Sequence, residues 1–239
     1  MKAMIFAAGI GSRLAPLTNK TPKALIEVGG KAAIGHVLDH ITGVGIKDIV
    51  INLHHFPDKI KQYVDKNYHQ KACISYSYED KELLETGGGL LKAKKIFADT
   101  DAILLHNADI LSNIDLEAFI KHHQNRKADV SLAVRDRNSS RKLHFNEENR
   151  LVGWENTKNK EIIGRKGISR FAFSGIHLIQ TRILKEFTKT GAFSIISQYL
   201  DIMHKIDIQA FLDNDSYWFD IGSKEKLEKA RAFFNSSLQ

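Results

Sequence analysis

A glycine-rich segment carrying two cations follows directly on the first apolar run of the chain. The run Ala3–Ala8 predicts a buried strand, and Gly9-Ile-Gly11-Ser-Arg13 comes immediately after it. Glycines at these two positions let backbone N–H groups approach phosphate oxygens, because no Cβ stands in the way. Arg13 and the later Lys23 add positive charges that suit a phosphate-bearing ligand. A loop at the carboxyl end of a buried strand is also where open α/β sheets bind their ligands.

Other interpretations of this loop fit the residues less well. A dinucleotide-binding fingerprint requires a third glycine at the position of Leu14, and a Walker A loop requires a glycine–lysine–serine or threonine run that this segment lacks. Pro16 and Pro22 favour an extended loop over an immediate helix. A purely structural turn would explain the glycines but not the prolines and the two cations together. We therefore interpret the loop as a phosphate-binding segment.

Two carboxylates in apolar runs could hold a cation beside such a phosphate. Asp109 closely follows the predicted strand Ile103–Leu105, and Asp220 stands between Phe219 and Ile221. Magnesium is commonly held by one or two carboxylates together with substrate phosphates and water. The plainer alternative is that Asp109 caps a turn and Asp220 caps a following helix, and the residues themselves leave it open.

The elements that must position these residues alternate between strand and helix. Buried strands are predicted at Ala3–Ala8, Ile49–Leu53, Ile74–Tyr78, Ile103–Leu105 and Val130–Val134. Helical periodicity is predicted near 34–41, 57–69, 89–97 and 116–120. Such alternation indicates a largely parallel sheet covered by helices on both faces.

After Asp136 the pattern changes to shorter strands separated by turns. Strands are predicted at 143–145, 151–154, 171–179 and 210–212, with helices near 196–203 and from 223 to 234. No internal repeat or linker separates the two parts. We therefore expect one domain over 1–239, with two halves at 1–135 and 136–239.

Composition restricts the class of protein and its partners. The 239 residues are 43% hydrophobic and 26% charged, as in globular domains, and 35 basic against 28 acidic residues give a net charge of +7. The net positive charge belongs either to a solvent-exposed basic surface or to a protein that binds small anionic ligands.

Aromatic residues do not alternate with the basic ones between 135 and 170, so no nucleic acid partner is expected. No apolar stretch approaches the ~18 residues of a membrane helix, so no membrane partner is expected. A single cysteine favours a reducing cytoplasm, and the oligomeric state stays open.

The glycine-rich loop resembles the signature of sugar-1-phosphate nucleotidyltransferases. The similar residues are Gly-Ile-Gly-Ser-Arg-Leu-Ala-Pro-Leu-Thr at 9–18 and Thr-Pro-Lys-Ala-Leu at 21–25. Further similar motifs fall in the family's order along the chain: Leu84–Gly89, His106–Asp109, Phe173–Ile176 and Trp218–Gly222. The resemblance implies a three-layer α/β/α sandwich with a Rossmann-like mixed sheet of the nucleotide-diphospho-sugar transferase type and a small sugar-side β extension. It also implies an enzyme that joins a nucleoside triphosphate to a sugar 1-phosphate and releases pyrophosphate. In such an enzyme 1–135 would be the nucleotide-binding half and 136–239 the sugar-binding half.

The resemblance also implies roles for individual residues. Arg13 would hold the β- and γ-phosphates, and Lys23 would neutralise the α-phosphate under attack. Asp109 and Asp220 would hold Mg²⁺ as the cofactor. Ligand-binding positions on the nucleotide and sugar sides would be Ala8, Gly9, Gly11, Ser12, Glu85, Gly88, Asn107, Glu155 and Gly175. The segment Gly87–Gly89, which contains Gly88, would be a base-binding turn.

Some positions depart from the family pattern. Ala108 stands where many members carry glycine, and Glu155-Asn156-Thr157 replaces a Glu-Lys-Pro run whose lysine touches the sugar phosphate. The missing cation could come from Arg141, Lys142 or Lys158. Trp154 and Trp218 are expected to pack in the core rather than to stack on a ligand.

Within the family, the chain is most similar to the uridylyltransferases that act on N-acetylmuramate 1-phosphate in cell-wall recycling. This similarity implies UTP and N-acetylmuramate 1-phosphate as substrates. The alternatives are a GTP-dependent mannose- or heptose-1-phosphate guanylyltransferase and a non-catalytic member of the fold that binds a nucleotide sugar.

Overall fold

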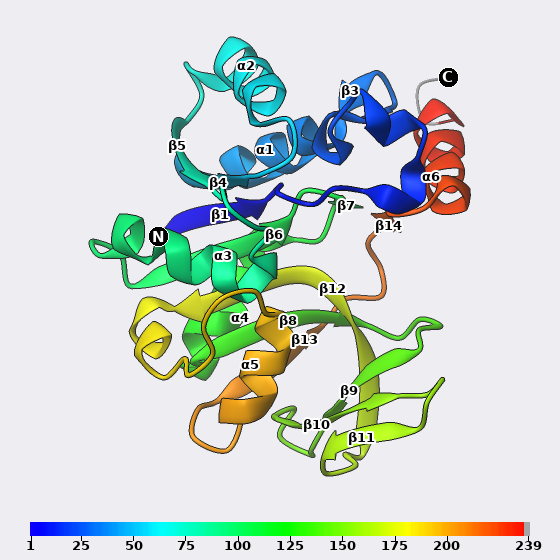
Figure 1. Cartoon of the computed structure of the whole chain (residues 1–239). Coiled ribbons are helices and arrows are strands. Elements are labelled where there is room, and N and C mark those ends of the chain that lie inside the picture. Colours follow the sequence, from blue (N-terminus) through cyan, green and yellow to red (C-terminus); the bar gives the residue numbers. More distant parts are fainter. Residues whose placement is uncertain (237–239) are drawn as a thin grey trace.

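The structure is a computed structural model that describes residues 1–236. Positions 237–239 of the expected domain lie outside the described residues. Within the described part of the chain, one ten-stranded sheet runs through the molecule (Figure 1). Its strands are β1 (Lys2–Phe6), β4 (Asp48–Leu53), β5 (Cys73–Tyr78), β6 (Ala102–Asn107), β8 (Val130–Arg135), β9 (Arg141–Phe145), β10 (Leu151–Asn156), β11 (Glu161–Gly164), β12 (Ser169–Gln180) and β13 (Ile208–Leu212).

Shorter pairs and six helices in residues 1–236 complete the fold. The paired strands are β2 (Glu27–Val28) with β3 (Lys31–Ala32), and β7 (Ile110–Ser112) with β14 (Trp218–Asp220). The helices are α1 (Ala33–Gly43), α2 (Pro57–Tyr68), α3 (Glu85–Ala93), α4 (Leu116–Arg126), α5 (Ile195–Ile202) and α6 (Lys224–Ser236). Short 3₁₀ helices lie at Ser12–Leu14, Leu17–Asn19, Lys23–Leu25, Lys94–Phe97 and Thr181–Lys185.

The first half of the sheet is parallel, in the order β5-β4-β1-β6. Met4 in β1 lies between Val50 of β4 and Leu105 of β6, and all three side chains are buried. Helices cover both faces of a parallel sheet, which explains why β1, β4 and β6 are largely apolar, whereas the edge strand β5 is only partly buried. The carboxyl ends of β1, β4 and β6 therefore meet at one edge, where polar residues begin.

Strand β12 joins this parallel half to the rest of the sheet. It runs antiparallel to β6 and continues into two branches, β8–β13 on one side and β9–β10–β11 on the other. Its pairing with β8 shifts register between Phe173 and His177, so the strand bends at Gly175. The second branch is the β extension expected from the sequence.

Helices pack on both faces of the sheet and form three layers. Ala3 and Ile5 of β1 belong to one buried cluster with residues of α1, α2 and α4, such as Ile34. Met4 belongs to the opposite cluster with residues of α3 and α5, such as Leu90. Successive side chains of a strand point to opposite faces, so each strand serves both clusters. The three-layer α/β/α expectation is confirmed.

The last helix returns to the first half of the molecule. In Figure 1, α6 (red) lies beside the N-terminal loops (blue), and Leu227 and Ala230 share a buried cluster with Leu14 and Val28. This return brings the segment just before α6 next to the glycine-rich loop. No helix among residues 1–236 is both long and apolar enough to span a bilayer.

Candidate active site

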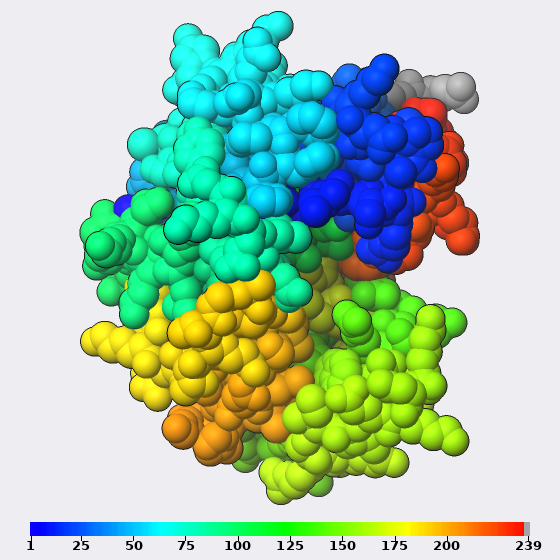
Figure 2. Space-filling model, viewed as in Figure 1, coloured from blue at the N-terminus to red at the C-terminus, as the bar shows by residue number. Residues whose placement is uncertain are grey.

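Two adjoining cavities lie where the carboxyl ends of the parallel strands face the β extension. The first has a volume of about 440 Å³ and the second about 620 Å³. Figure 2 shows the surface hollowed between the N-terminal half (blue to teal) and the yellow-green β extension. Both cavities are lined by Arg13, Thr86, Asn107, Asp109, Arg141 and Ser194. A ligand that fills both would therefore cross a junction carrying two arginines and a carboxylate.

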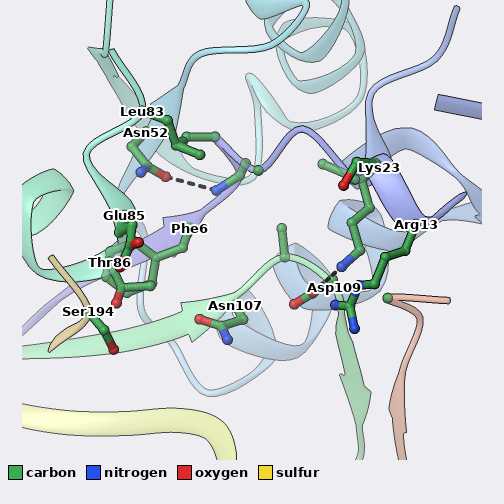
Figure 3. Close-up of a pocket in the computed structure, with 18 of the residues that line it drawn as sticks. Phe6, Arg13, Lys23, Asn52, Leu83, Glu85, Thr86, Asn107, Asp109 and Ser194 are labelled. Atoms are coloured by element: carbon green, nitrogen blue, oxygen red, sulfur yellow. Dashed lines mark hydrogen bonds and ion pairs between the residues drawn. The ribbon is translucent and has the colours of Figure 1, made fainter. Parts of the chain in front are cut away.

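The glycine-rich loop forms one wall of the first cavity. The expected residues that line it are Ala8, Gly9, Gly11, Ser12, Arg13 and Lys23. Gly11 has φ +70°, and a Cβ there would lie 3.0 Å from Thr18 Cγ2 and 3.1 Å from Lys23 Cβ. Only glycine adopts this conformation without strain, so it lets the chain fold back and bring Arg13 and Lys23 to one side (Figure 3).

A buried carboxylate fixes the opposite wall. Glu79 is 1% exposed, and it accepts hydrogen bonds from Asn52 Nδ2 at 2.7 Å and from the Leu84 N–H at 2.8 Å. Asn52 Oδ1 in turn accepts from the Ala7 N–H at 2.8 Å. This network ties the segment before α3 to the ends of β1 and β4. It positions Glu85, which lines the cavity in a left-handed conformation with φ +56°.

The three glycines at 87–89 lie inside α3, so the expected base-binding turn is the first part of a helix. A Cβ on Gly87 would lie 2.1 Å from the Phe193 ring, and one on Gly88 would lie 2.1 Å from the Gly191 carbonyl oxygen. A Cβ on Gly89 would lie 2.7 Å from Glu79 Oε1. The glycines thus permit close packing around the helix, which the sequence does not reveal.

The two predicted metal carboxylates lie side by side. Asp220 of β14 pairs with Ile110 of β7, the residue after Asp109, and the Ile221 N–H donates to the Asp109 carbonyl oxygen at 3.0 Å. Lys23 forms an ion pair with Asp109, and Lys226 forms one with Asp220 at 2.5 Å. Figure 3 shows Lys23 and Arg13 both extending towards Asp109.

The charge of Asp220 is stabilised by its neighbours. Burial alone would raise the pKa of the Asp220 carboxyl, but the ion pair with Lys226, the Gly222 N–H and the nearby Lys23 together hold it below its usual value. The carboxyl is therefore ionised at neutral pH and available to a cation.

The donor set at this point fits a hard divalent cation such as Mg²⁺. Asp109 and Asp220 offer carboxylate oxygens, and no cluster of three or more histidine, cysteine or acidic ligands occurs among the described residues. Mg²⁺ is usually bound by one or two carboxylates, with substrate phosphates and water completing its octahedron. The lysine partners of both carboxylates supply positive charge at the same place.

Gly222 is enclosed by this cluster, which leads to a first prediction. A Cβ at Gly222 would lie 2.7 Å from Asp220 Oδ1, 3.0 Å from an Arg13 guanidinium nitrogen and 3.2 Å from Lys23 Nζ. We expect Gly222→Ala to lower kcat about 10- to 100-fold, because displacements of the order of 1 Å in a catalytic cluster have such effects. Gly43→Ala is the matched control, since a Cβ on Gly43 meets nothing within 4 Å. Equal kcat for both variants would show that the cluster tolerates displacement.

The second cavity is lined by aromatic and cationic side chains of the β extension and β14. Trp218 lies in this wall, with its Nε1 donating to the Ser174 carbonyl oxygen at 2.8 Å, and Gly175 and Trp154 line it too. Both tryptophans pack against a buried cluster, as expected, and each also lines the cavity. The sequence around these two tryptophans did not indicate that they line a cavity as well as pack against the core.

Of the three candidates for the missing cation, Arg141 lines both cavities. Lys142 donates to the Arg137 carbonyl oxygen at 2.7 Å, and Lys158 is exposed in the turn after β10. Arg137 also lines the second cavity, although the sequence did not single it out. The structure therefore places Arg137 and Arg141 on the cavity walls together with Arg13, and neither of the candidate lysines.

Arg135 is a further residue that the sequence analysis missed. Its guanidinium binds Asp213 at 2.9 Å and the Asn214 and Ser216 carbonyl oxygens at 3.0 and 2.6 Å. These contacts fix the loop that leads into β14, and through it the positions of Trp218 and Asp220.

The predicted site residues divide into those that line a cavity and those that do not. Glu85, Asn107, Gly175 and both aspartates line at least one cavity, together with the loop residues above. Gly88 and Glu155 line neither cavity in the described part of the chain. Glu155 pairs instead with Arg170 at 2.7 Å, while its strand neighbours Trp154 and Asn156 line the second cavity.

The chain is similar to several known proteins. Residues 2–145 match the nucleotidyl transferase family. Over 99 residues the chain is 39% identical to N-acetylmuramate alpha-1-phosphate uridylyltransferase of Caulobacter vibrioides, covering 41% of each chain. Over 244 residues it is 26% identical to the catalytic subunit beta of mannose-1-phosphate guanylyltransferase of Dictyostelium discoideum, covering 100% of this chain and 66% of that protein, just under two thirds.

Other similar proteins match this chain over nearly the whole length of both chains. The D-glycero-alpha-D-manno-heptose 1-phosphate guanylyltransferase of Aneurinibacillus thermoaerophilus is 25% identical over 248 residues, covering 97% of each chain. Among solved structures, apo-UDP-glucose pyrophosphorylase superposes with a TM-score of 0.83 at 17% identity, covering 100% of each chain. At this identity the superposition shows a shared fold, the one expected from the sequence.

Proposed function

The chain belongs to the nucleotidyl transferase family, and we propose that it transfers a nucleotidyl group from a nucleoside triphosphate to a sugar 1-phosphate. The observation that carries the proposal is the junction of the two cavities at Arg13, Asn107, Asp109 and Arg141. A nucleotide in the first cavity and a sugar phosphate in the second would place their phosphates together at this junction.

The reaction joins two anions, so its transition state needs positive charge. An oxygen of the sugar phosphate attacks the α-phosphorus, a new P–O bond forms, and the bond to the departing pyrophosphate breaks. Lys23 would neutralise the α-phosphate, and Arg13 would hold the β- and γ-phosphates with its planar fork of donors. No covalent enzyme intermediate is required, because the sugar phosphate is itself the nucleophile.

Asp109 and Asp220 would hold the Mg²⁺ that the family requires. When bound, the ion neutralises charge on the reacting phosphates. Asn107 lies on the wall of both cavities and would contact the ribose or the phosphates. Ala8, Gly9, Gly11, Ser12 and Glu85 line the part of the first cavity where the base and triphosphate would lie, and Gly88 would support it from within α3.

Our preferred substrates are UTP and N-acetylmuramate 1-phosphate. The 39% identity to the Caulobacter uridylyltransferase supports this choice, although it covers 41% of the chain. Arg137 and Arg141 on the wall of the second cavity suit a sugar that carries a carboxylate as well as a phosphate. With these substrates the protein would act in the cytoplasm, in the recycling of peptidoglycan.

A GTP-dependent mannose- or heptose-1-phosphate guanylyltransferase is a second candidate. Matches to such enzymes extend over 97 to 100% of this chain, including the sugar-side half, though at 25 to 26% identity. This candidate shares the same reaction and the same catalytic residues. The two differ only in the base and the sugar.

A matrix of substrates distinguishes the candidates. UTP and GTP are each paired with the 1-phosphates of N-acetylmuramate, N-acetylglucosamine, glucose, mannose and heptose, and pyrophosphate release is measured. We expect the highest kcat/KM for UTP with N-acetylmuramate 1-phosphate. If the protein prefers GTP with mannose or heptose 1-phosphate and does not turn over N-acetylmuramate 1-phosphate, the preferred substrates are wrong. The proposed reaction, nucleotidyl transfer to a sugar 1-phosphate, would still stand.

A further inference from the structure

Arg137 lies in the wall of the second cavity. Its guanidinium carbon is 4.3 Å from the centre of the Trp218 ring, and one terminal nitrogen donates to the Phe173 carbonyl oxygen at 3.0 Å. A guanidinium stacks well on an indole face, which holds its donors in a fixed plane. The indole is fixed in turn by its hydrogen bond to Ser174.

The guanidinium lacks a carboxylate partner among residues 1–236. Arg135, two positions earlier, forms an ion pair with Asp213 and two further hydrogen bonds. Arg137 forms no ion pair in the same part of the chain, and its buried Nε has no hydrogen-bond partner there. Burial lowers the pKa of Arg137, against the attraction of Asp220. A partly desolvated cation of this kind is stabilised when an anionic oxygen reaches it.

The position of Arg137 separates it from the groups that serve the reacting phosphates. Arg13 and Arg141 line both cavities, whereas Arg137 lines only the second. A sugar 1-phosphate whose phosphate lies at the junction would extend its ring past Gly175 towards the Arg137–Trp218 pair. A negative group on the ring would then meet the guanidinium.

We propose that Arg137, held over the Trp218 ring, is a specificity-determining residue that binds an anionic oxygen of the sugar substrate. The inference rests on the proposed function, because it assigns the second cavity to a sugar 1-phosphate. Two groups could supply that oxygen: a carboxylate on the sugar ring, as in the lactyl ether of N-acetylmuramate, or the 1-phosphate itself. The chemistry of recognition is a charge-assisted hydrogen bond in either case.

Binding of three probes without nucleotide distinguishes the two sources. Calorimetry measures Kd for N-acetylmuramate, N-acetylglucosamine 1-phosphate and N-acetylmuramate 1-phosphate, on the wild-type protein and on Arg137→Met. If Arg137 binds the carboxylate, the variant weakens binding of the two muramates about 10- to 100-fold and leaves the glucosamine phosphate unchanged. If it binds the 1-phosphate, the two phosphates weaken and free muramate does not. The first pattern supports the proposal, whereas the second would place Arg137 at the reacting phosphate and overturn its role in specificity.

Controls keep the experiment independent of folding and of turnover. Arg165→Met removes an exposed arginine of the same half that lines neither cavity, and it should bind all three probes like wild type. Arg137→Lys keeps the positive charge but not the planar pair of donors, so its binding should lie between those of wild type and Arg137→Met. It replaces Arg137→Met in the experiment if that variant is unstable. Equal binding by wild type and both Arg137 variants, or no binding of any probe by wild type, overturns the proposal. Failure of the proposed function would appear separately, as bound sugar phosphate without pyrophosphate release.

Discussion

Asp109→Asn is expected to lower kcat about 10²–10³-fold while leaving the fold intact, the loss typical when a preorganised charged group is removed from a reacting centre. The carboxamide is nearly the same size, but it carries no charge and is a weak ligand for Mg²⁺. It also removes the ion pair with Lys23, whose side chain then loses its fixed position beside the junction. Magnesium-dependent pyrophosphate release, together with the melting temperature, measures both effects.

The matched control for this change is Asp101→Asn. Asp101 is exposed just before β6 and lines neither cavity, so the same loss of charge should leave kcat unchanged. Raising the magnesium concentration should restore part of the activity of Asp109→Asn, since the variant weakens the ion's site. A folded Asp109→Asn protein with wild-type kcat would remove this carboxylate from the mechanism.

Lys23→Met is expected to reduce kcat/KM by a comparable factor, about 10²–10³. The methionine keeps much of the aliphatic stem but removes the ammonium that would neutralise the α-phosphate. The Lys23 side chain lies at the wall of the first cavity, with Nζ 3.2 Å from the Cβ position of Gly222. Initial rates at varied nucleotide concentration separate the loss of binding from the loss of turnover.

Lys20→Met provides the comparison for Lys23, because Lys20 is an exposed lysine of the same loop that lines neither cavity. The double variant Lys23→Met with Asp109→Asn should lose much less than the product of the two single losses, since the residues act as one unit. Strictly multiplicative losses would indicate that the lysine and the aspartate act independently. A Lys23→Met protein as active as Lys20→Met would exclude the proposed role.

Strand–helix alternation predicted the fold well because both faces of the parallel sheet are buried. The apolar runs of β1, β4, β6 and β8 stood out for that reason, and their order along the chain indicated the layers. The pairing of β7 with β14 could not be predicted, because each strand has three residues and lies more than a hundred positions from its partner. The single-domain assignment stays a prediction.

The loop residues of the site were predictable, whereas the packing around them was not. Gly11, Arg13 and Lys23 form a local pattern whose chemistry is visible in the sequence. The helix around Gly87–Gly89 depends on contacts with Phe193, Gly191 and Glu79, which the sequence does not show. A turn was expected there from the family resemblance, and glycine is usually destabilising inside a helix.

The sugar side was the least predictable part of the site. Glu155 was chosen for its place in a motif, yet it faces Arg170, while Trp154 and Asn156 line the cavity. A register difference of one residue in a strand changes the face of every side chain, and motif position alone does not fix it. Arg137 was missed because a single arginine in a basic segment carries no pattern.

The most direct test of nucleotidyl transfer is ³¹P nuclear magnetic resonance of the reaction mixture. The protein is incubated with magnesium, UTP or GTP and each sugar 1-phosphate, and the phosphorus signals are followed with time. For at least one pair, the account predicts that the sugar phosphate and triphosphate signals decline together while pyrophosphate and a nucleoside diphosphate sugar appear in equal amounts. Release of orthophosphate from the triphosphate without use of the sugar phosphate, or no change with any pair, would contradict it.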